Sequence, residues 1–497
     1  MTTDISSPGV ERGASRGHAA VRTDAGVLWN VVVAAGIGWS LLFVVIGLRY
    51  QLQMYADGSI FSYSVAVQDA WSYHLHNISG RLFVYLYSFA PAEIYVELAK
   101  DAGGGIAIYG FLFFVAQLLG LAATYAADRG KGRIIFSYAC FSTACLCPLV
   151  FGFPTEMWIA HALFWPALAV CHYARAGIRG YALAFALLLA LTFTHLGGLV
   201  LAMAIVASLL PRGALDPAFR RAATAFLVVM LIRTVVKTIY PPDDYIAPVL
   251  ASAGRHFFDE SVFTGDLIVL LFATLAGYAI SFLIVKRFNP AKAHLYVALI
   301  VAMALAVYWL RFDDALHAQN RYYLRTALLL ATLGLGALAA AFALDADGRF
   351  NLPIPFLPRL LAALRSGMAA RAATGGLLLV MLVHAVETAK FVTAWADYKA
   401  AVGTLAMGAA SDPALGDAHF VSAARIGAGL NRLAWRSTTP YLSELVAHDF
   451  APSRLVVDPT SNYFWLSCKT ATKNLTANRV IPAESRRLVR VYSCLHR

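Results

Sequence analysis

The feature that most constrains this chain is a succession of apolar segments, each long enough to cross a lipid bilayer as a helix. A bilayer core of about 30 Å needs roughly 20 apolar residues in a helix, and we count about eleven such runs. They cover residues 27–49, 104–126, 133–153, 157–174, 180–194, 196–211, 222–240, 265–285, 294–310, 324–344 and 374–394. With 60% hydrophobic and 14% charged residues, the chain is not an ordinary soluble protein. We predict a mainly α polytopic membrane protein.

The loops between these runs alternate in character. One set is short and basic: Arg129, Lys131, Arg133, Arg175, Arg179, Arg212, Arg220, Arg221, Lys286, Arg287 and Lys292. Basic loops stay on the cytoplasmic side, so the other loops, which hold most acids and histidines, face outward. We expect a multi-pass protein of the bacterial inner membrane, with a cytoplasmic amino terminus and a periplasmic carboxyl terminus.

The pair 180–194 and 196–211 allows two interpretations. One long broken helix would invert the topology downstream, whereas two short crossings joined at His195 keep the next basic connector cytoplasmic. The second interpretation agrees better with the positive-inside rule.

Three regions follow from this pattern. Residues 1–26 are polar and predict a disordered cytoplasmic tail, and 396–497 predict a small periplasmic α/β domain. Between them, the transmembrane region 27–395 carries outer loops at 50–103, 241–264 and 311–323. In the last region we predict a helix at 413–434, strands at 454–458 and 488–494, and a candidate disulfide between Cys468 and Cys494.

Asp57 is the first candidate for chemistry. It lies soon after the first apolar run, in the stretch Tyr55 to Tyr63, where a carboxylate could act as a general base toward a hydroxyl. The alternative is a loop acid that caps a helix beginning near Ser59.

The same loop holds a second polar cluster, His74, His76, Asn77 and Arg81. An arginine can bind a phosphate or carboxylate through two hydrogen bonds, and we interpret the cluster as substrate-binding. A metal site is a weaker interpretation, because a third ligand would have to come from a distant loop. A divalent cation therefore stays open, and we assign no metal ligands and no certain cofactor.

Arg233 and Lys237 share one face near the outer end of the run 222–240. A cation two turns deep in a membrane pairs with an acid or faces a cavity. Arg233 and Lys237 therefore either bind a lipid phosphate or pair with acids such as Asp243 and Asp244.

Further candidates for substrate binding lie at helix ends and outer loops. Paired acids followed by Arg-Tyr can bind sugar hydroxyls, although Tyr and Arg also anchor helices at the membrane interface. The set comprises Glu156, His195, His256, Asp313, Asp314, Arg321 and Tyr322.

Several function classes are disfavoured. The net charge is +12, and many of the positive charges lie in cytoplasmic connectors. No basic module stands apart from the membrane region, so we expect no nucleic-acid partner. The sequence has no P-loop motif for nucleotide binding.

The layout resembles the GT-C superfamily of integral-membrane glycosyltransferases, in which an acid of the first outer loop precedes an amphipathic helix. Here Asp57 matches that acid, 82–97 the helix and 396–497 the outer domain. Family members often carry adjacent acids in this loop, whereas Asp57 is followed by Gly58 and the next acid is Asp69.

The resemblance implies sugar transfer from a polyprenyl-phosphate donor to a glycan or lipid acceptor of the cell envelope. Asp57 would be the base, and Arg233, Lys237 and Arg321 would stabilise the departing phosphate. The alternatives are a transporter or flippase of a lipid-linked intermediate, and a surface-polysaccharide polymerase or ligase.

Overall fold

The computed structural model describes residues 15–71, 79–146, 155–175, 177–239, 265–312, 318–350, 361–363, 366–408, 412–415, 420–447, 452–458, 462–463 and 478–479. Its main helices are α1 (Ser15–Tyr50), α2 (Asp57–Ala66), α4 (Ala90–Ala99), α5 (Ala102–Ala127), α6 (Ile134–Leu146), α7 (Glu156–Tyr173), α8 (Ile178–Thr192), α9 (Leu196–Ala207), α10 (Pro217–Ile239), α12 (Gly265–Phe288), α13 (Ala293–Phe312), α14 (Ala318–Ala346) and α16 (Gly367–Met407).

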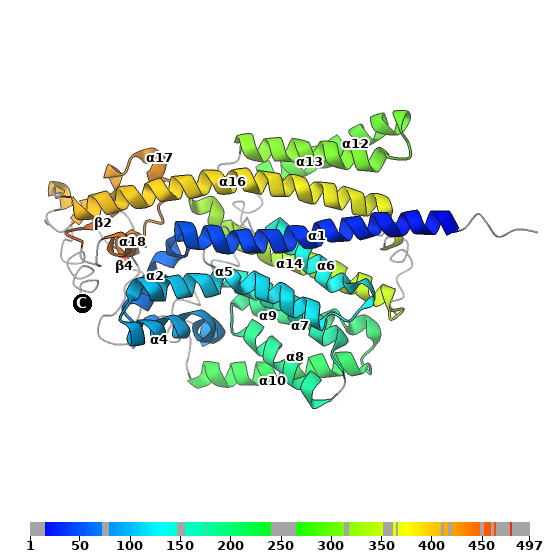
Figure 1. Cartoon of the computed structure of the whole chain (residues 1–497), viewed down its shortest axis with the longest axis horizontal. Coiled ribbons are helices and arrows are strands. Elements are labelled where there is room, and N and C mark those ends of the chain that lie inside the picture. The colour runs from blue at the N-terminus through cyan, green and yellow to red at the C-terminus, as the bar shows by residue number, and fades with distance from the viewer. Residues whose placement is uncertain are drawn as a thin grey trace, which may run out of the picture.

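Helices α1 and α16 pack along each other and run the length of the molecule (Figure 1). Helices α5, α6 and α7 pack on one side of this pair, and α8, α9 and α10 pack beyond α7. The hairpin of α12 and α13 packs on α16 through α13. Short helix α2, helix α4 and the carboxyl-terminal elements gather at one end of the bundle (Figure 1), which we call the α2 end.

Aromatic side chains fill the centre of the bundle. Phe43 of α1 packs edge-on against Phe114 of α5, with ring centroids 5.1 Å apart, and lies 4.8 Å from Trp158 of α7. Outward-facing positions are also apolar, as shown by Val45 and Leu227, which are 63% and 68% exposed. A water-soluble helix would expose polar residues there, so these faces indicate contact with lipid.

Six helices among the described residues are long and apolar enough to cross a membrane. They cover Leu28–Tyr50, Leu82–Ala99, Ala102–Ala127, Pro217–Ile239, Leu328–Ala346 and Gly367–Met407. The fold is thus that of a mostly helical, membrane-embedded protein. The expected total of about eleven crossings, like the assignment of the two faces, stays a prediction.

Two predicted boundaries are corrected by long helices. Helix α1 begins at Ser15, so residues 15–26 are helical and only 1–14 of the predicted tail lie outside the described residues. Helix α16 continues to Met407, so 396–407 belong to it and not to a separate domain. Both extensions are rich in alanine, the strongest helix former, which explains why helix persists into more polar sequence.

The outer loop predicted at 50–103 is largely helical. After the 3-10 turn η1 (Leu52–Met54) and α2 come η3 (Ser79–Arg81), α3 (Leu82–Val84), the π-helical turn η4 (Tyr85–Phe89) and α4. The structure is thus helical over 82–99, where we predict a helix along the membrane surface. Because this helix is also long and apolar enough to cross a membrane, its placement on the surface stays a prediction. The outer loop 241–264 lies outside the described residues.

The carboxyl-terminal region has a small parallel pair of strands. β1 (Phe420–Ser422) pairs with β2 (Leu455–Val457), in the register Phe420 with Leu455. Strand β2 agrees with the prediction at 454–458, whereas the predicted helix at 413–434 is wrong, because β1 interrupts it. The other elements of this region are η8 (Pro413–Leu415), η9 (Ala423–Arg425), α17 (Ala428–Asn431), α18 (Thr439–Val446) and the antiparallel strands β3 (Asn462–Tyr463) and β4 (Asn478–Arg479). The helical region also contains two short 3-10 turns, η5 (Lys131–Arg133) and η7 (Leu210–Arg212).

Candidate active site

The predicted site residues that the structure describes most fully lie at the α2 end. Asp57 begins α2, Arg81 ends η3, Glu156 begins α7, His195 precedes α9, and Arg233 lies in the last half of α10. These elements are distant in sequence, so their arrangement depends on the contacts described below.

Asp57 lies in the first turn of α2 and is partly exposed. A carboxylate at this position interacts favourably with the positive end of the helix dipole, which accounts for the local structure without requiring catalysis. The residue before it, Ala56, has φ 54° and ψ −128°, a conformation unfavourable for a residue with a Cβ. Such strain persists only where surrounding structure holds it.

The carboxyl-terminal half of the chain provides that support. The Thr438 hydroxyl donates to the Ala56 carbonyl at 3.0 Å. The indole of Trp395 and the ammonium of Lys399, both on α16, donate to the Tyr50 carbonyl, each at 3.0 Å. Both ends of the turn that presents Asp57 are therefore fixed by distant segments.

Arg81 and Glu156 form a buried ion pair. Arg81 Nη1 lies 2.6 Å from Glu156 Oε1, and the side chains are 13% and 4% exposed. Glu156 stands at the start of α7, where the Thr155 hydroxyl accepts from the Met157 amide as the helix cap. Removing either partner of such a buried pair is costly, because the other charge then stays buried without the group that compensated it.

Arg233 reaches the same region from α10. It is 8% exposed, and its Nη1 donates to the Thr192 carbonyl at 2.7 Å. A Cβ added at Gly80 would lie 3.5 Å from Arg233 Nη2, so this guanidinium lies next to the residue that precedes Arg81. Lys237, one turn further along, is exposed.

The turn between α8 and α9 completes this end of the site. The Phe83 amide donates to the Phe193 carbonyl at 3.0 Å, which ties the helical stretch after η3 to the turn. His195 is the N-cap of α9, and its Nδ1 accepts from the Gly197 amide at 3.0 Å. This bond gives His195 a structural role as a cap and orients its ring.

Tyr109 of α5 is a site residue that the sequence did not reveal. It is 1% exposed and lies within electrostatic range of both the Glu156 and the Asp57 carboxylates. Its hydroxyl therefore lies in the surroundings of both carboxylates. In sequence it is one more aromatic residue in an apolar helix, which carries no sign of this role.

Helix α18 adds a buried carboxyl group behind α2. Glu444 is 2% exposed, and burial raises its pKa to about 8. Burial and the neighbouring Glu444 also raise the pKa of the Tyr63 hydroxyl on α2. The rings of Tyr63 and Tyr441 pack with centroids 5.4 Å apart.

The other predicted site residues lie in parts of the chain that the structure does not describe in full. His74, His76, Asn77, His256, Asp313 and Asp314 lie outside the described residues, as do Cys468 and Cys494, and Arg321 and Tyr322 are described only as part of the helical backbone of α14. Within the described ranges, no group of three or more His, Cys, Asp or Glu side chains could hold a metal ion.

The site thus contains a partly exposed carboxylate, a buried ion pair and a second buried cation. Such a set can accept a proton and stabilise negative charge on an oxyanion or phosphate. The chain matches no protein-family model, no curated protein and no solved structure, so this chemistry rests on the residues themselves.

Proposed function

We propose that the protein is a membrane glycosyltransferase that moves a hexosyl or pentosyl group, with inversion, from a polyprenyl-phosphate donor to a cell-envelope glycan or lipid. The observation that carries the proposal is the gathering of Asp57, the Arg81–Glu156 pair and Arg233 at one end of an apolar helical bundle. A lipid-linked donor reaches such a site from the membrane and supplies a phosphate leaving group, so the protein needs no nucleotide site.

The proposed reaction is a single displacement. The acceptor hydroxyl oxygen attacks the anomeric carbon of the donor sugar while its proton passes to the Asp57 carboxylate. The bond between that carbon and the phosphate oxygen breaks, and the polyprenyl phosphate leaves with the electron pair. Arg233 and Lys237 would hold the leaving phosphate, because guanidinium and ammonium groups stabilise charge that develops in the transition state.

The state of the Arg81–Glu156 pair supports this division of roles. Glu156 forms an ion pair with Arg81 at 2.6 Å. Because this pairing disfavours Glu156 as the general base, we assign that role to Asp57. Arg233, by contrast, has the Thr192 backbone carbonyl as its hydrogen-bond partner among the described residues, and a carbonyl does not neutralise its charge. An anionic ligand would do so.

The interior of the bundle favours a transferase over the alternative of a transporter. In the second turn of α7, His161 is fully buried, and both of its ring nitrogens are hydrogen-bonded. Nδ1 pairs with Gln117 Oε1, and Nε2 with the Ser142 hydroxyl, both at 2.9 Å. These polar groups satisfy one another within the packed core, whereas a transport path would present them to a passing headgroup.

The test is sugar transfer by membranes that contain the protein, measured with a panel of radiolabelled polyprenyl-phosphate sugars. Asp57→Asn should reduce transfer by at least about a hundredfold, the contribution typical of a general base. Asp69→Asn, a loop acid beyond the far end of α2, is the matched control and should retain most activity. Wild-type transfer by the Asp57→Asn variant would exclude Asp57 as the base.

A further inference from the structure

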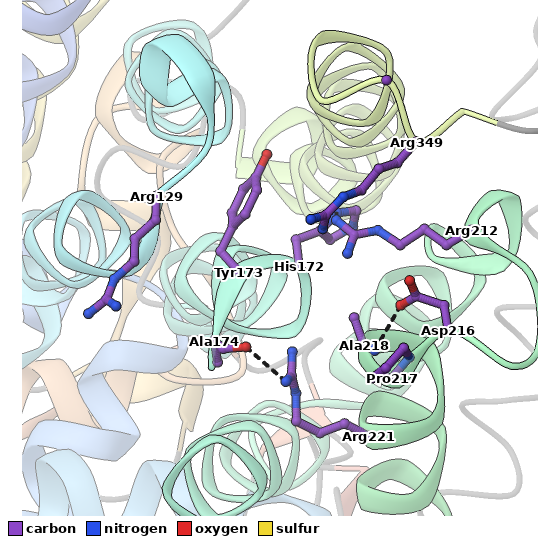
Figure 2. Close-up of a pocket in the computed structure, with 11 residues that line it drawn as sticks. Arg129, His172, Tyr173, Ala174, Arg212, Asp216, Pro217, Ala218, Arg221 and Arg349 are labelled. Carbon is purple, nitrogen blue, oxygen red and sulfur yellow. Dashed lines mark hydrogen bonds between the residues drawn. The ribbon is translucent and has the colours of Figure 1, made fainter. Parts of the chain in front are cut away.

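A second polar site lies where the connector between α9 and α10 meets the end of α7. An open cavity of about 630 Å³ is lined there by the last residues of α7, the first turn of α10 and the residues that follow α14 (Figure 2). Four of its lining residues are arginines, namely Arg129, Arg212, Arg221 and Arg349.

The negative charge among the residues that line this cavity is smaller than the positive charge of its arginines. Asp216 is the one acidic residue among the described side chains that line it. Its carboxylate accepts from the Ala218 amide at 2.8 Å and from the Phe219 amide at 3.4 Å, which caps α10. Asp347, outside the lining, lies within electrostatic range of Arg212. The cavity therefore has a net positive charge.

Arg221 is a structural brace. Its Nη1 donates to the Ala174 carbonyl at 2.8 Å and its Nη2 to the Cys171 carbonyl at 2.9 Å. These carbonyls belong to the carboxyl end of α7, where a helix lacks backbone donors. Arg221 thus holds α10 against α7 and still contributes its charge to the cavity.

Arg212 has a hydrogen-bond donor that no described residue uses. Its Nε is buried and has no hydrogen-bond partner among the described residues, and its Nη2 lies 3.4 Å from His172 Nδ1. The Ser208 hydroxyl donates to the Ile205 carbonyl, so it accepts from His172 Nε2 at 2.9 Å. His172 Nδ1 is then the unprotonated nitrogen and faces Arg212 as a neutral acceptor.

Arg349 approaches Arg212 from the other wall. Figure 2 shows both side chains extending toward His172, and the two guanidinium charges lie within electrostatic range of each other. Two like charges that face a common space repel each other. An anion placed between them would remove this repulsion and accept the unused hydrogen bonds.

Membrane topology alone does not explain this arrangement. Arginines that only orient a protein need to remain near the bilayer surface, as the exposed Arg179 and Arg220 do. Arg212 is instead partly buried, and one of its donors lacks a partner among the residues that the structure describes.

We propose that this cavity binds the phosphate group of an anionic ligand, either a lipid headgroup or a soluble phosphorylated compound, through Arg212 and Arg349. The planar guanidinium matches phosphate oxygens in pairs of hydrogen bonds. Basic pockets between membrane helices bind lipid phosphates, and the cavity volume lies in the range of about 300–1,000 Å³ common for small-molecule sites. The site is separate from Asp57 and does not depend on the proposed transferase activity.

The experiment uses the purified full-length protein and two probes. Inorganic pyrophosphate is titrated calorimetrically against the protein in neutral detergent, and native mass spectrometry counts phosphatidylglycerol molecules retained from mixed phosphatidylglycerol–phosphatidylcholine nanodiscs. Saturable pyrophosphate binding indicates a soluble ligand, and selective retention of phosphatidylglycerol alone indicates a lipid headgroup.

Arg212→Gln and Arg349→Gln should each weaken binding of the active probe by about tenfold or more, the value of one charge-assisted hydrogen bond. Arg220→Gln removes the same charge from an exposed position on α10 and should bind as the wild type does. Because Arg349 is exposed, its substitution keeps the test decisive if Arg212→Gln fails to fold. Absence of binding by both probes, or an equal loss in Arg220→Gln, would overturn the proposal.

Discussion

Arg81 Nη1 lies 2.6 Å from Glu156 Oε1, and this buried ion pair joins the segment after α2 to the first residue of α7. The pair holds Arg81 beside Gly80, which lies next to Arg233, and holds Glu156 within electrostatic range of Tyr109. Its integrity therefore matters for stability as well as for the arrangement of the proposed site.

Glu156→Gln should destabilise the protein by about 3 kcal/mol or more, because it removes the carboxylate that is paired with the buried Arg81 guanidinium. Thermal unfolding in detergent is the measurement. Glu97→Gln removes a carboxylate from the exposed pair with Lys100 and should leave the unfolding temperature unchanged. Equal behaviour of the two variants would show that the buried pair contributes no more than a surface one.

Arg233→Gln should weaken use of the lipid donor more than it affects folding. Loss of a charge-assisted contact to phosphate predicts a rise in KM for the donor of about tenfold. Arg220→Gln, on an exposed part of the same helix, is the control for loss of one positive charge. An unchanged donor KM in Arg233→Gln would argue against a phosphate at this position.

Glu444 should make stability depend on pH. Burial raises its pKa to about 8 in the folded protein, whereas an unfolded glutamate has a pKa of about 4.3. Below the unfolded pKa both states are protonated. As pH rises from there to about 8, the unfolded state loses its proton first, so Glu444 progressively destabilises the folded protein.

The unfolding temperature of the wild type relative to Glu444→Gln should therefore fall between about pH 5 and pH 8. Parallel curves for the two proteins across this range would contradict the raised pKa. The comparison isolates Glu444 from other groups that titrate in the same interval.

Two glycines of α1 provide a matched test of helix packing. A Cβ added at Gly36 would lie 2.6 Å from the Cys140 Cα on α6, whereas one at Gly38 would meet nothing within 4 Å. Gly36→Ala should destabilise by about 1–3 kcal/mol through overpacking. Gly38→Ala should be neutral or stabilising, because alanine favours helix. Comparable unfolding temperatures for both variants would argue against the close α1–α6 contact.

Much of the helical architecture could be predicted from the sequence, because a long apolar run in lipid can satisfy its backbone hydrogen bonds within a helix. Helices α5 and α10 lie where hydropathy placed apolar spans at 104–126 and 222–240. The ends of α1 and α16 could not be predicted in this way, since both extend into polar sequence that hydropathy assigns to a tail or a domain.

The contacts between side chains of the candidate site could not be predicted from the sequence. Arg81 and Glu156 were each recognised as polar residues of outer loops, but nothing in their spacing indicates that they pair. Arg233 was expected to bind a phosphate or an acid, and its described partner is the Thr192 carbonyl, a group that every residue carries. For Arg212 the sequence indicates only a role in membrane topology, because His172 and Arg349, which lie near it in the structure, belong to other elements.

The most direct measurement is sugar transfer by the purified protein in proteoliposomes that contain a radiolabelled polyprenyl-phosphate sugar and an acceptor glycolipid. The account predicts that label appears on the acceptor while polyprenyl phosphate is released, and that Asp57→Asn abolishes both while Asp69→Asn does not. Movement of intact donor between the two leaflets without any transfer of the sugar would contradict it.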